Sequence, residues 1–492
     1  MTQQLERPIA GATTGHRQAL AERRTLERPA PRGTRSYTAA QRAEHLCDPG
    51  SFMALTPMHA GGASGVVAGW GDVDGRPVVV ISHDAAVAAG AISSVFADAV
   101  QKAQRLAIDR GFPIIYLNDS SGARIHDGIH ALHGCGGIFK NNVIAQKRVP
   151  QISVILGPCA GAAAYSPALT DWTIMLKGQA QMFLTGPDIV RATTGEDATA
   201  EDIGGSALHT KTSGVAHLEV SSEDEAFDAV RRFLSFLPSH VGGEMPMRAP
   251  QKPNAEAEAM LPFVVPDKAS VIFDMNDVLD GILDEGERFD LMPDFAPSVL
   301  TTFGRLRGRP VGILANQPAH RGGVLDAKAS VKASRFVEFC TRFGLPVLTF
   351  VDVPGFLPGT VEESRGVITH GATLLHAYAA ATSPLLTVIV RKAYGGAYIA
   401  MGAKSLGADF SWAWSGSEIA VMGPGGAVAL LHRRELAASD TPEALRDELA
   451  ATYREDVARP WLAAEAGIVD EVIYPEETRQ RMVAALAMLS AE

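Results

Sequence analysis

An internal duplication constrains the fold of this chain more than any other feature of its sequence. Eight residues of the first half recur in the second half at a constant offset of 233 positions. Most of them are glycines or prolines, whose backbone geometry other residues replace poorly. The pairs are Gly71/Gly304, Gly75/Gly308, Arg76/Arg309, Pro77/Pro310, Gly90/Gly323, Pro113/Pro346, Asp119/Asp352 and Gly122/Gly355. Such a repeat predicts two domains of one fold, and 492 residues exceed what a single hydrophobic core usually supports.

Each copy alternates short apolar runs with segments of helical periodicity. The runs read as buried strands, and the periodic segments between them read as helices. The expected strands are 78–82, 113–117 and 152–156 in the first copy and 311–315, 346–351 and 385–390 in the second. The expected long helices are 93–110 and 328–343. This alternation predicts an α/β architecture with buried strands in both halves.

Two segments fall outside the repeat. Residues 1–35 are polar, rich in Arg and Ala and broken by prolines, and we expect a flexible N-terminal arm there. Residues 239–270 are rich in Pro, Ala, Glu and Lys without a clear period, which indicates a linker. The expected domains are therefore 36–238 and 271–492.

The composition argues against several classes of protein. A net charge of -11 disfavours a nucleic-acid binder, because neutralising phosphates requires a basic face. Four cysteines without CxxC spacing fit a reduced, cytoplasmic chain better than a disulfide framework. No apolar run approaches the ~20 residues of a membrane span, so we expect no membrane association.

Each half runs a continuous apolar strand into a cluster of small residues. The clusters are PCAGAAA at 158–164 and YGGAY at 394–398, and after Gly122 the offset grows so that Gly161-Ala162 align with Gly396-Ala397. Small side chains let a ligand oxygen approach backbone N–H groups at the start of a helix, which is how an oxyanion hole can form. Close packing of helix against strand is the alternative explanation of the same clusters. Neither a GxSxG elbow nor a GxxxxGK[ST] loop occurs.

Several segments resemble the carboxyltransferase β subunits of biotin-dependent acyl-CoA carboxylases, the propionyl-CoA and acetyl-CoA carboxylase group. The most specific are FVDVPGFLPG at 350–359 and RKAYGGAY at 391–398. The others are 118–125, 157–161, 183–187, 194–196, 212–216, 315–318 and 406–409. The resemblance extends from about Gly69 to the end of the chain.

The resemblance implies an α/β fold of two duplicated crotonase-like ββα-superhelix domains, of the ClpP/crotonase type. It places acyl-CoA in the first domain and carboxybiotin in the second. Gly161 and Ala162 then hold the thioester oxygen while the α-carbon loses its proton, and Gly396 and Ala397 hold the ureido oxygen of biotin. The freed biotin nitrogen is the base, and no metal is needed.

The family pattern also implies further site residues and partners. The substrate-binding residues are Ser121, Gly122, Ala123, Arg124, Tyr165 and Ile399. The biotin-binding residues are Gly355, Phe356, Tyr394 and Gly395. Because the chain has no Ala-Met-Lys-Met biotinylation motif, biotin arrives on a separate biotin carboxylase or biotin carrier subunit. Such subunits pair head to tail into a homo-oligomer, usually a hexamer.

The first half departs from the family pattern, which keeps other functions open. It has Gly161-Ala162 where the family usually has two glycines, and Ser121 in place of a glycine. The alternatives are a biotin-dependent decarboxylase subunit for malonyl- or methylmalonyl-CoA, and a carboxyltransferase for a non-standard or carrier-bound thioester. A crotonase-type hydratase and a non-catalytic scaffold subunit complete the set. The acyl group is not specified by the sequence.

Three histidines follow the first-half loop in a pattern that the family does not supply. His126, His130 and His133 stand at i, i+4 and i+7, with Cys135 just beyond, so a helix there would present all three on one face. An exposed or hydrogen-bonded helix face is the favoured interpretation. A histidine at the substrate entrance and a metal site are the two alternatives.

Overall fold

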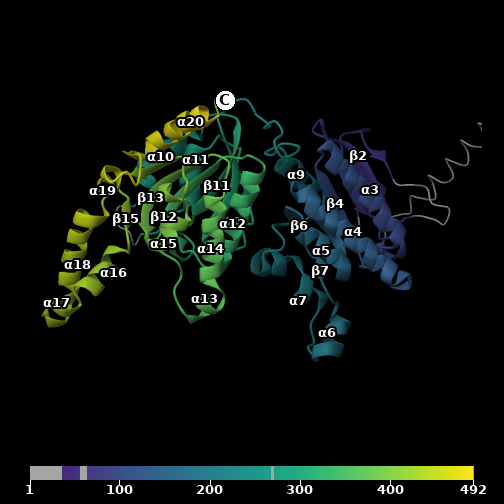
Figure 1. The fold of residues 1–492 in the computed structure, drawn as a ribbon, viewed down its shortest axis with the longest axis horizontal. Coiled ribbons are helices and arrows are strands. Elements are labelled where there is room, and N and C mark those ends of the chain that lie inside the picture. Colours follow the sequence, from purple (N-terminus) through teal and green to yellow (C-terminus); the bar gives the residue numbers. More distant parts are fainter. Residues whose placement is uncertain (1–35, 56–63, 267–270, 491–492) are drawn as a thin grey trace, which may run out of the picture. The chain divides into compact units, whose positions relative to one another are not determined.

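The computed structural model describes residues 36–55, 64–266 and 271–490, which form two compact units (Figure 1). The first unit contains the described residues up to His209 together with Glu219–Arg231. The second contains Thr210–Leu218 and the described residues from Arg232 onward. The expected N-terminal arm, 1–35, lies outside the described residues. The domain limits drawn from the sequence remain predictions.

The first sheet has eight strands within the described residues, in the order β1-β2-β3-β4-β5-β6-β8, with β7 paired to β5. Its strands are β1 Met53–Ala54, β2 Val66–Val73, β3 Arg76–His83, β4 Ile114–Ser120, β5 Gln151–Ala160, β6 Trp172–Leu176, β7 Gln181–Phe183 and β8 Leu218–Val220. β1, β2 and β3 pair antiparallel, whereas β3 to β6 are parallel. β4 and β5 are buried almost throughout, as their continuous apolar runs predict.

The second sheet repeats this arrangement strand for strand. Within the described residues it has eight strands in the order β16-β14-β13-β12-β11-β10-β9, with β15 paired to β13. Its strands are β9 Phe289–Leu291, β10 Val299–Leu306, β11 Arg309–Asn316, β12 Val347–Val353, β13 Leu385–Tyr394, β14 Phe410–Trp414, β15 Glu418–Ala420 and β16 Glu471–Ile473. Because β1 to β8 correspond in order to β9 to β16, the duplicated, crotonase-like α/β fold predicted from the sequence is confirmed.

Helices connect the strands of both sheets. Up to residue 234 they are α2 Ala39–Leu46, η1 Ala88–Gly90, α3 Ser94–Arg110, η2 Ile125–Asp127, α4 Ile129–Gln146, η3 Gly161–Ala164, α5 Tyr165–Ala168, α6 Pro187–Thr194, α7 Ala200–Gly204, α8 Ser206–Leu208, η4 His209–Ser213 and α9 Glu223–Leu234. Beyond it they are α10 Ala255–Val264, α11 Met275–Ile282, η5 Arg321–Gly323, α12 Ala327–Arg342, α13 Thr360–Ser364, α14 Val367–Ala379, α15 Gly395–Ala400, η6 Lys404–Leu406, α16 Pro424–Leu431, α17 Arg433–Ala438, α18 Pro442–Tyr453, η7 Arg454–Ala458, α19 Pro460–Glu465, η8 Pro475–Glu477 and α20 Thr478–Leu489.

Capping residues fix the ends of the two long helices, α3 and α12. Ser93 caps α3 by accepting the Phe96 N–H, and Gly111, with φ +71°, ends it. Asp326 caps α12 in the same way through the Ala329 N–H. Both helices therefore match the ranges expected from their periodicity.

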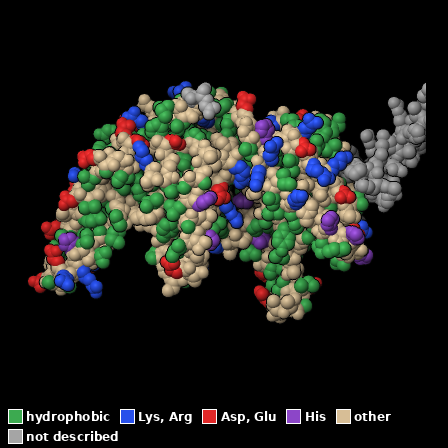
Figure 2. All heavy atoms as spheres, viewed as in Figure 1, with side chains coloured by type: hydrophobic (Ala, Val, Ile, Leu, Met, Phe, Trp, Pro, Cys, Tyr) green, Lys and Arg blue, Asp and Glu red, His purple; other side chains and the backbone are tan. Residues whose placement is uncertain are grey.

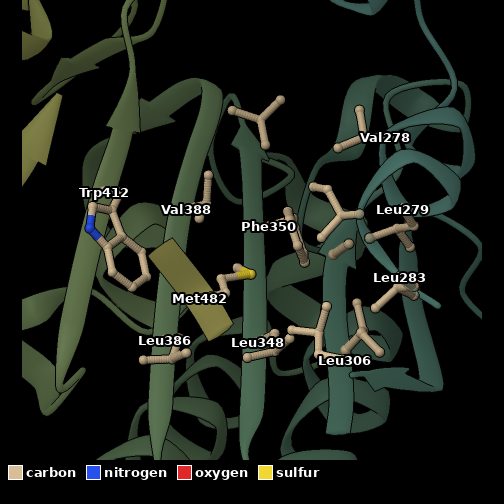
Figure 3. Packing of buried hydrophobic residues seen from close by; sticks show 14 of the residues in the cluster. Val278, Leu279, Leu283, Leu306, Leu348, Phe350, Leu386, Val388, Trp412 and Met482 are labelled. Atoms are coloured by element: carbon tan, nitrogen blue, oxygen red, sulfur yellow. The ribbon is translucent and has the colours of Figure 1, made fainter. Parts of the chain in front are cut away.

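The core of the second unit lies between its sheet and the helices that cover it (Figure 3). Apolar side chains from six strands, β10 to β14 and β16, meet those of α10, α11 and α20. The residues labelled in Figure 3 are Val278, Leu279, Leu283, Leu306, Leu348, Phe350, Leu386, Val388, Trp412 and Met482. Burying each large side chain of this kind stabilises the unit by roughly 1.5–3 kcal/mol.

The segment expected as a linker contains a short helix. Within 239–270, α10 packs its Leu261 side chain beneath Gly281 of α11. Leu261 is buried in the core of the second unit, so this part of the segment belongs to that core. None of the helices formed by the described residues is long and apolar enough to cross a membrane.

Candidate active site

Each unit has a glycine turn where a buried strand passes into a short helix. β5 ends at Ala160 and η3 begins at Gly161, while β13 ends at Tyr394 and α15 begins at Gly395. Gly161 has φ +58° and Gly395 has φ +61°, a conformation that side chains disfavour. Strand ends and backbone angles therefore match Gly161 with Gly395 and Ala162 with Gly396. The sequence alignment of Gly161-Ala162 with Gly396-Ala397 was off by one residue.

The N–H groups at the start of these helices are open to approach. The first N–H groups of a helix have no partner within it, and they carry the positive end of its dipole. A Cβ placed on Gly396 would meet no atom within 4 Å, and one on Gly161 would meet only the Leu184 carbonyl oxygen, at 3.7 Å. Gly396 is exposed, whereas Gly161 and Ala162 are half-buried and Ala397 is buried. Each turn can therefore receive a small acceptor oxygen.

In the first unit, the loop after β4 lies against the glycine turn. A Cβ on Gly122 (φ +100°) would stand 2.7 Å from the Ala160 carbonyl oxygen, so only glycine permits this approach. Gly122 N–H donates to Ser120 Oγ at 3.2 Å, and Ser121 N–H donates to the Ala89 carbonyl at 3.0 Å. The structure thus brings the predicted substrate loop beside the predicted oxyanion hole.

The remaining residues of this loop differ in exposure. Ser121 is exposed and Ala123 is half-buried in a short parallel bridge to Ile92. Arg124 has about half of its side chain in solvent, with Nε 3.7 Å from Asp127 Oδ1. That guanidinium is free enough to meet an anionic ligand.

Tyr165 begins α5, four residues after Gly161. Half of its surface is exposed, and its ring meets the Phe139 ring edge-on at 5.9 Å. Ile399 lies on α15, three residues after Gly396, and is also partly exposed. Each of the two side chains lies within a few residues of the glycine turn of its own unit.

In the second unit, the loop after β12 forms a short parallel bridge between Leu325 and Phe356, which corresponds to the first-unit bridge between Ile92 and Ala123. Leu325 N–H donates to the Gly355 carbonyl at 3.2 Å, and Leu357 N–H donates to the Leu325 carbonyl at 2.7 Å. Gly355 has φ +147°, and a Cβ there would meet no atom within 4 Å. The Phe356 ring packs over α14, where it stands 3.1 Å from the position of a Cβ on Gly371.

Tyr394 has a buried side chain that turns away from solvent. Its hydroxyl donates to Glu418, which also accepts from Arg454 Nε at 2.7 Å. Burial, together with the Glu418 carboxylate, raises the pKa of Tyr394, so the phenol stays protonated. Gly423 lies against the same ring, 3.0 Å from Cε2 to the position of a Cβ. The side chain therefore supports the glycine turn, and only its backbone borders the open space.

Buried carboxylates lie against the strands that lead into the two glycine turns, and the functional interpretation of the sequence did not include them. Asp119 and Asp352 are almost wholly inaccessible. Arg42 reaches Asp119, with Nη1 3.3 Å from Oδ2, and Arg391 reaches Asp352, with Nη2 2.8 Å from Oδ2. A signal was present, because these aspartates form one of the eight duplicated pairs.

The three histidines do not share one helix. His126 lies in η2, and Gly128, with φ 51° and ψ −130°, separates it from His130 and His133 in α4. All three are exposed, and Figure 2 shows histidine side chains at the surface over α4. Among the described residues, no group of three His, Cys, Asp or Glu side chains is placed to hold a metal ion. The prediction of a single three-histidine face is wrong because Gly128 interrupts the helix.

Comparison with known proteins confirms the family resemblance predicted from the sequence, over nearly the whole chain. The carboxyl transferase domain family matches residues 30–492. The propionyl-CoA carboxylase carboxyltransferase subunit of Haloferax mediterranei is 48% identical over 467 residues, with 92% of this chain and 90% of that protein covered. The methylmalonyl-CoA decarboxylase subunit alpha of Veillonella parvula is 46% identical, with 87% and 82% covered. A crystal structure of the transcarboxylase 12S hexamer with methylmalonyl-coenzyme A bound has a TM-score of 0.89 at 38% identity, with 100% and 97% covered.

Proposed function

This chain belongs to the carboxyl transferase domain family and is a carboxyltransferase of the acyl-CoA carboxylase group, and we propose how its two units divide the reaction. The first unit binds the acyl-CoA thioester, and the second binds carboxybiotin carried by a partner subunit. The observation that carries this proposal is the pair of glycine turns at equivalent strand ends, one in each unit. One hole in each unit fits a transfer between two carbonyl compounds.

The first turn stabilises the thioester oxygen as the α-carbon loses its proton. N–H groups at Gly161 and Ala162 point toward the oxygen on which negative charge develops. A single preorganised donor of this kind contributes roughly 3–4 kcal/mol to the transition state. Arg124, half-exposed in the loop beside this turn, is suited to an anionic part of the CoA ester.

The second turn fits the ureido group of biotin. Its carbonyl oxygen is an acceptor, and Gly396 leaves open space in front of the α15 N–H groups at Gly396 and Ala397. Gly395, which begins α15, and Gly355 and Phe356, in the loop after β12, are the proposed contacts of the biotin ring. When bound, carboxybiotin supplies the carboxyl group and a ureido nitrogen of suitable basicity. The chain's own part is to hold the oxygen and to keep the turn rigid through Tyr394.

We propose a short acyl-CoA of the propionyl type as the substrate. The support is the name of the Haloferax mediterranei relative, a propionyl-CoA carboxylase carboxyltransferase subunit. Biotin would be carried on a biotin carboxylase or carrier subunit. The assembly would be a homohexamer, as in the transcarboxylase 12S structure, acting in the cytoplasm.

The reverse direction is the second candidate. The Veillonella parvula relative is named as a methylmalonyl-CoA decarboxylase subunit, and the same two turns would serve carboxyl transfer from a CoA ester onto biotin. The first proposal predicts that a biotin carboxylase subunit confers ATP-dependent carboxylation of propionyl-CoA.

The test is carboxyl transfer from labelled methylmalonyl-CoA to biocytin by the purified chain. We expect the labelled carboxyl group to appear on biocytin. Other carboxylated CoA esters of similar size should donate their carboxyl group more slowly than methylmalonyl-CoA does. Addition of a biotin carboxylase subunit, bicarbonate and ATP then tests the forward direction with acetyl-, propionyl- and butyryl-CoA. A pure chain that transfers no labelled carboxyl group from methylmalonyl-CoA to biocytin, and that carboxylates none of the three acyl-CoA esters when the partner subunit is added, would refute the proposed function.

A further inference from the structure

The two buried aspartates face an irregularity of the strands that lead into the glycine turns. Between β4 and β5 the register passes from Asn118↔Ile155 to Ser120↔Cys159, so Asp119 alone stands opposite three residues of β5. Between β12 and β13 it passes from Val351↔Ile389 to Val353↔Ala393, so Asp352 stands opposite three residues of β13. Such bulges redirect a strand, and here each lies directly before a turn.

Each aspartate occupies its bulge. A Cβ on Gly157 of β5 would stand 2.3 Å from Asp119 Oδ1, so that carboxylate lies directly against the bulged backbone. In the second unit, Lys392 N–H of β13 donates to Asp352 Oδ1 at 2.9 Å. The carboxylate thus accepts a hydrogen bond from an N–H of the bulge that has no partner on the neighbouring strand.

The two units supply the opposite charge from different places. In the second unit it comes from the bulge itself, because Arg391 donates from Nε and Nη2 to the two Asp352 oxygens at 3.3 and 2.8 Å. At the equivalent positions of β5 stand Gly157 and Pro158, which have neither a guanidinium nor, in the case of proline, an N–H. The first unit needs another source of charge.

That source is α2, which precedes the duplicated sheet. Arg42 Nη1 donates to Asp119 Oδ2 at 3.3 Å, and its Nε and Nη2 donate to the two carboxylate oxygens of Glu223 at 2.8 and 2.9 Å. Arg42, Asp119 and Glu223 are all buried. A second contact joins α2 to α9, since Arg231 Nη2 donates to the Leu46 carbonyl at 2.8 Å.

We propose that Asp119 and Asp352 are positioning residues, each fixing the path of its strand into one glycine turn, and that α2 provides the counter-charge for the acyl-thioester turn alone. The proposal rests on the proposed function of the two turns. Loss of Arg42 disturbs the first turn and leaves the second intact. Loss of Arg391 does the reverse.

The experiment measures carboxyl transfer from methylmalonyl-CoA to biocytin by the full chain carrying Arg42→Gln or Arg391→Gln. A displacement of about 1 Å at a reacting group costs on the order of 100-fold in rate, so kcat should fall in both variants. Arg42→Gln should raise the KM for methylmalonyl-CoA and weaken its calorimetric Kd, with the KM for biocytin at the parent value. Arg391→Gln should raise the KM for biocytin alone.

Two controls separate positioning from stability. Arg305→Gln removes a buried guanidinium that donates to Glu287 at 3.0 Å, so it should lower the melting temperature without moving either KM. The triple variant Arg42→Met, Asp119→Asn, Glu223→Gln leaves none of these three buried charges unpaired and should fold, yet still show the raised KM for methylmalonyl-CoA.

The outcomes are distinct. A parent chain that transfers no carboxyl group contradicts the proposed function. An active parent whose triple variant keeps the parent KM, Kd and kcat overturns the positioning role of Asp119. An Arg42→Gln enzyme that raises both KM values equally overturns the assignment of α2 to the first turn.

Discussion

Replacing Gly396 with valine should abolish carboxyl transfer while leaving the chain folded. Gly396 lies in α15 without a left-handed backbone angle, and a Cβ there would meet no atom within 4 Å. Glycine and valine differ by only a few tenths of a kcal/mol in helix propensity, so we expect a stability change below about 1 kcal/mol. The new side chain instead fills the space through which an oxygen must approach.

The functional loss should be far larger. Removing one donor of an oxyanion hole costs roughly 100- to 1,000-fold in kcat, which corresponds to about 3–4 kcal/mol. Blocking the approach to the α15 N–H groups should cost at least that much. The binding of the CoA ester, measured by calorimetry, should stay at the parent value, because that ester is assigned to the other unit.

A matched control is available in the same unit. Gly426 is also helical and exposed, with no atom within 4 Å of a Cβ, so Gly426→Val reproduces the steric change outside the turn. The assay is labelled carboxyl transfer to biocytin, with circular dichroism to check folding. Parent-like transfer by a folded Gly396→Val enzyme would show that no acceptor oxygen binds at this turn.

Two further predictions concern the first unit. Gly122→Ala should lower the free energy of unfolding by about 2 kcal/mol or more, since its Cβ would stand 2.7 Å from the Ala160 oxygen at φ +100°. Gly355 also has a positive φ, +147°, but a Cβ there meets no atom within 4 Å, so Gly355→Ala should lose less stability in the same thermal denaturation. Burial lowers the pKa of His83 from 6.5 to about 4, so only the unfolded chain is protonated between these values, and stability should decrease by up to about 3 kcal/mol as pH falls from 6.5 toward 4. Denaturant titrations across this range should show a shallower pH dependence in His83→Asn, and an unchanged slope would contradict the buried neutral state.

Most of the fold could be predicted from the internal duplication. Constant spacing of glycines and prolines located β3, β4, β11 and β12, because these residues terminate strands and turns in both copies. The alignment failed only at the glycine turns, where the second half holds one more residue between Gly355 and Gly395 than the first holds between Gly122 and Gly161. The positive φ angles of Gly161 and Gly395 show which residues correspond, and counting residues in the sequence cannot reveal these angles.

The buried charge network could not be predicted from periodicity. Arg42 and Asp119 are 77 residues apart, and α2 lies outside the repeat, so nothing in the repeat indicates their contact. The helical histidine face failed for a local reason, since Gly128 adopts an angle that ends one helix and begins the next. The paired aspartates, by contrast, were visible as duplicates whose role only the bulges explain.

Hydrogen exchange with each ligand in turn tests the division of labour between the two units most directly. Methylmalonyl-CoA should slow exchange of the backbone amides at 121–124 and 161–165 and leave 394–398 unchanged. Biocytin should slow exchange at 355–356 and 394–399 and leave the first turn unchanged. Protection of the same turn by both ligands, or protection of neither turn by a ligand that is carboxylated or decarboxylated, would contradict the assignment of one glycine turn to each substrate.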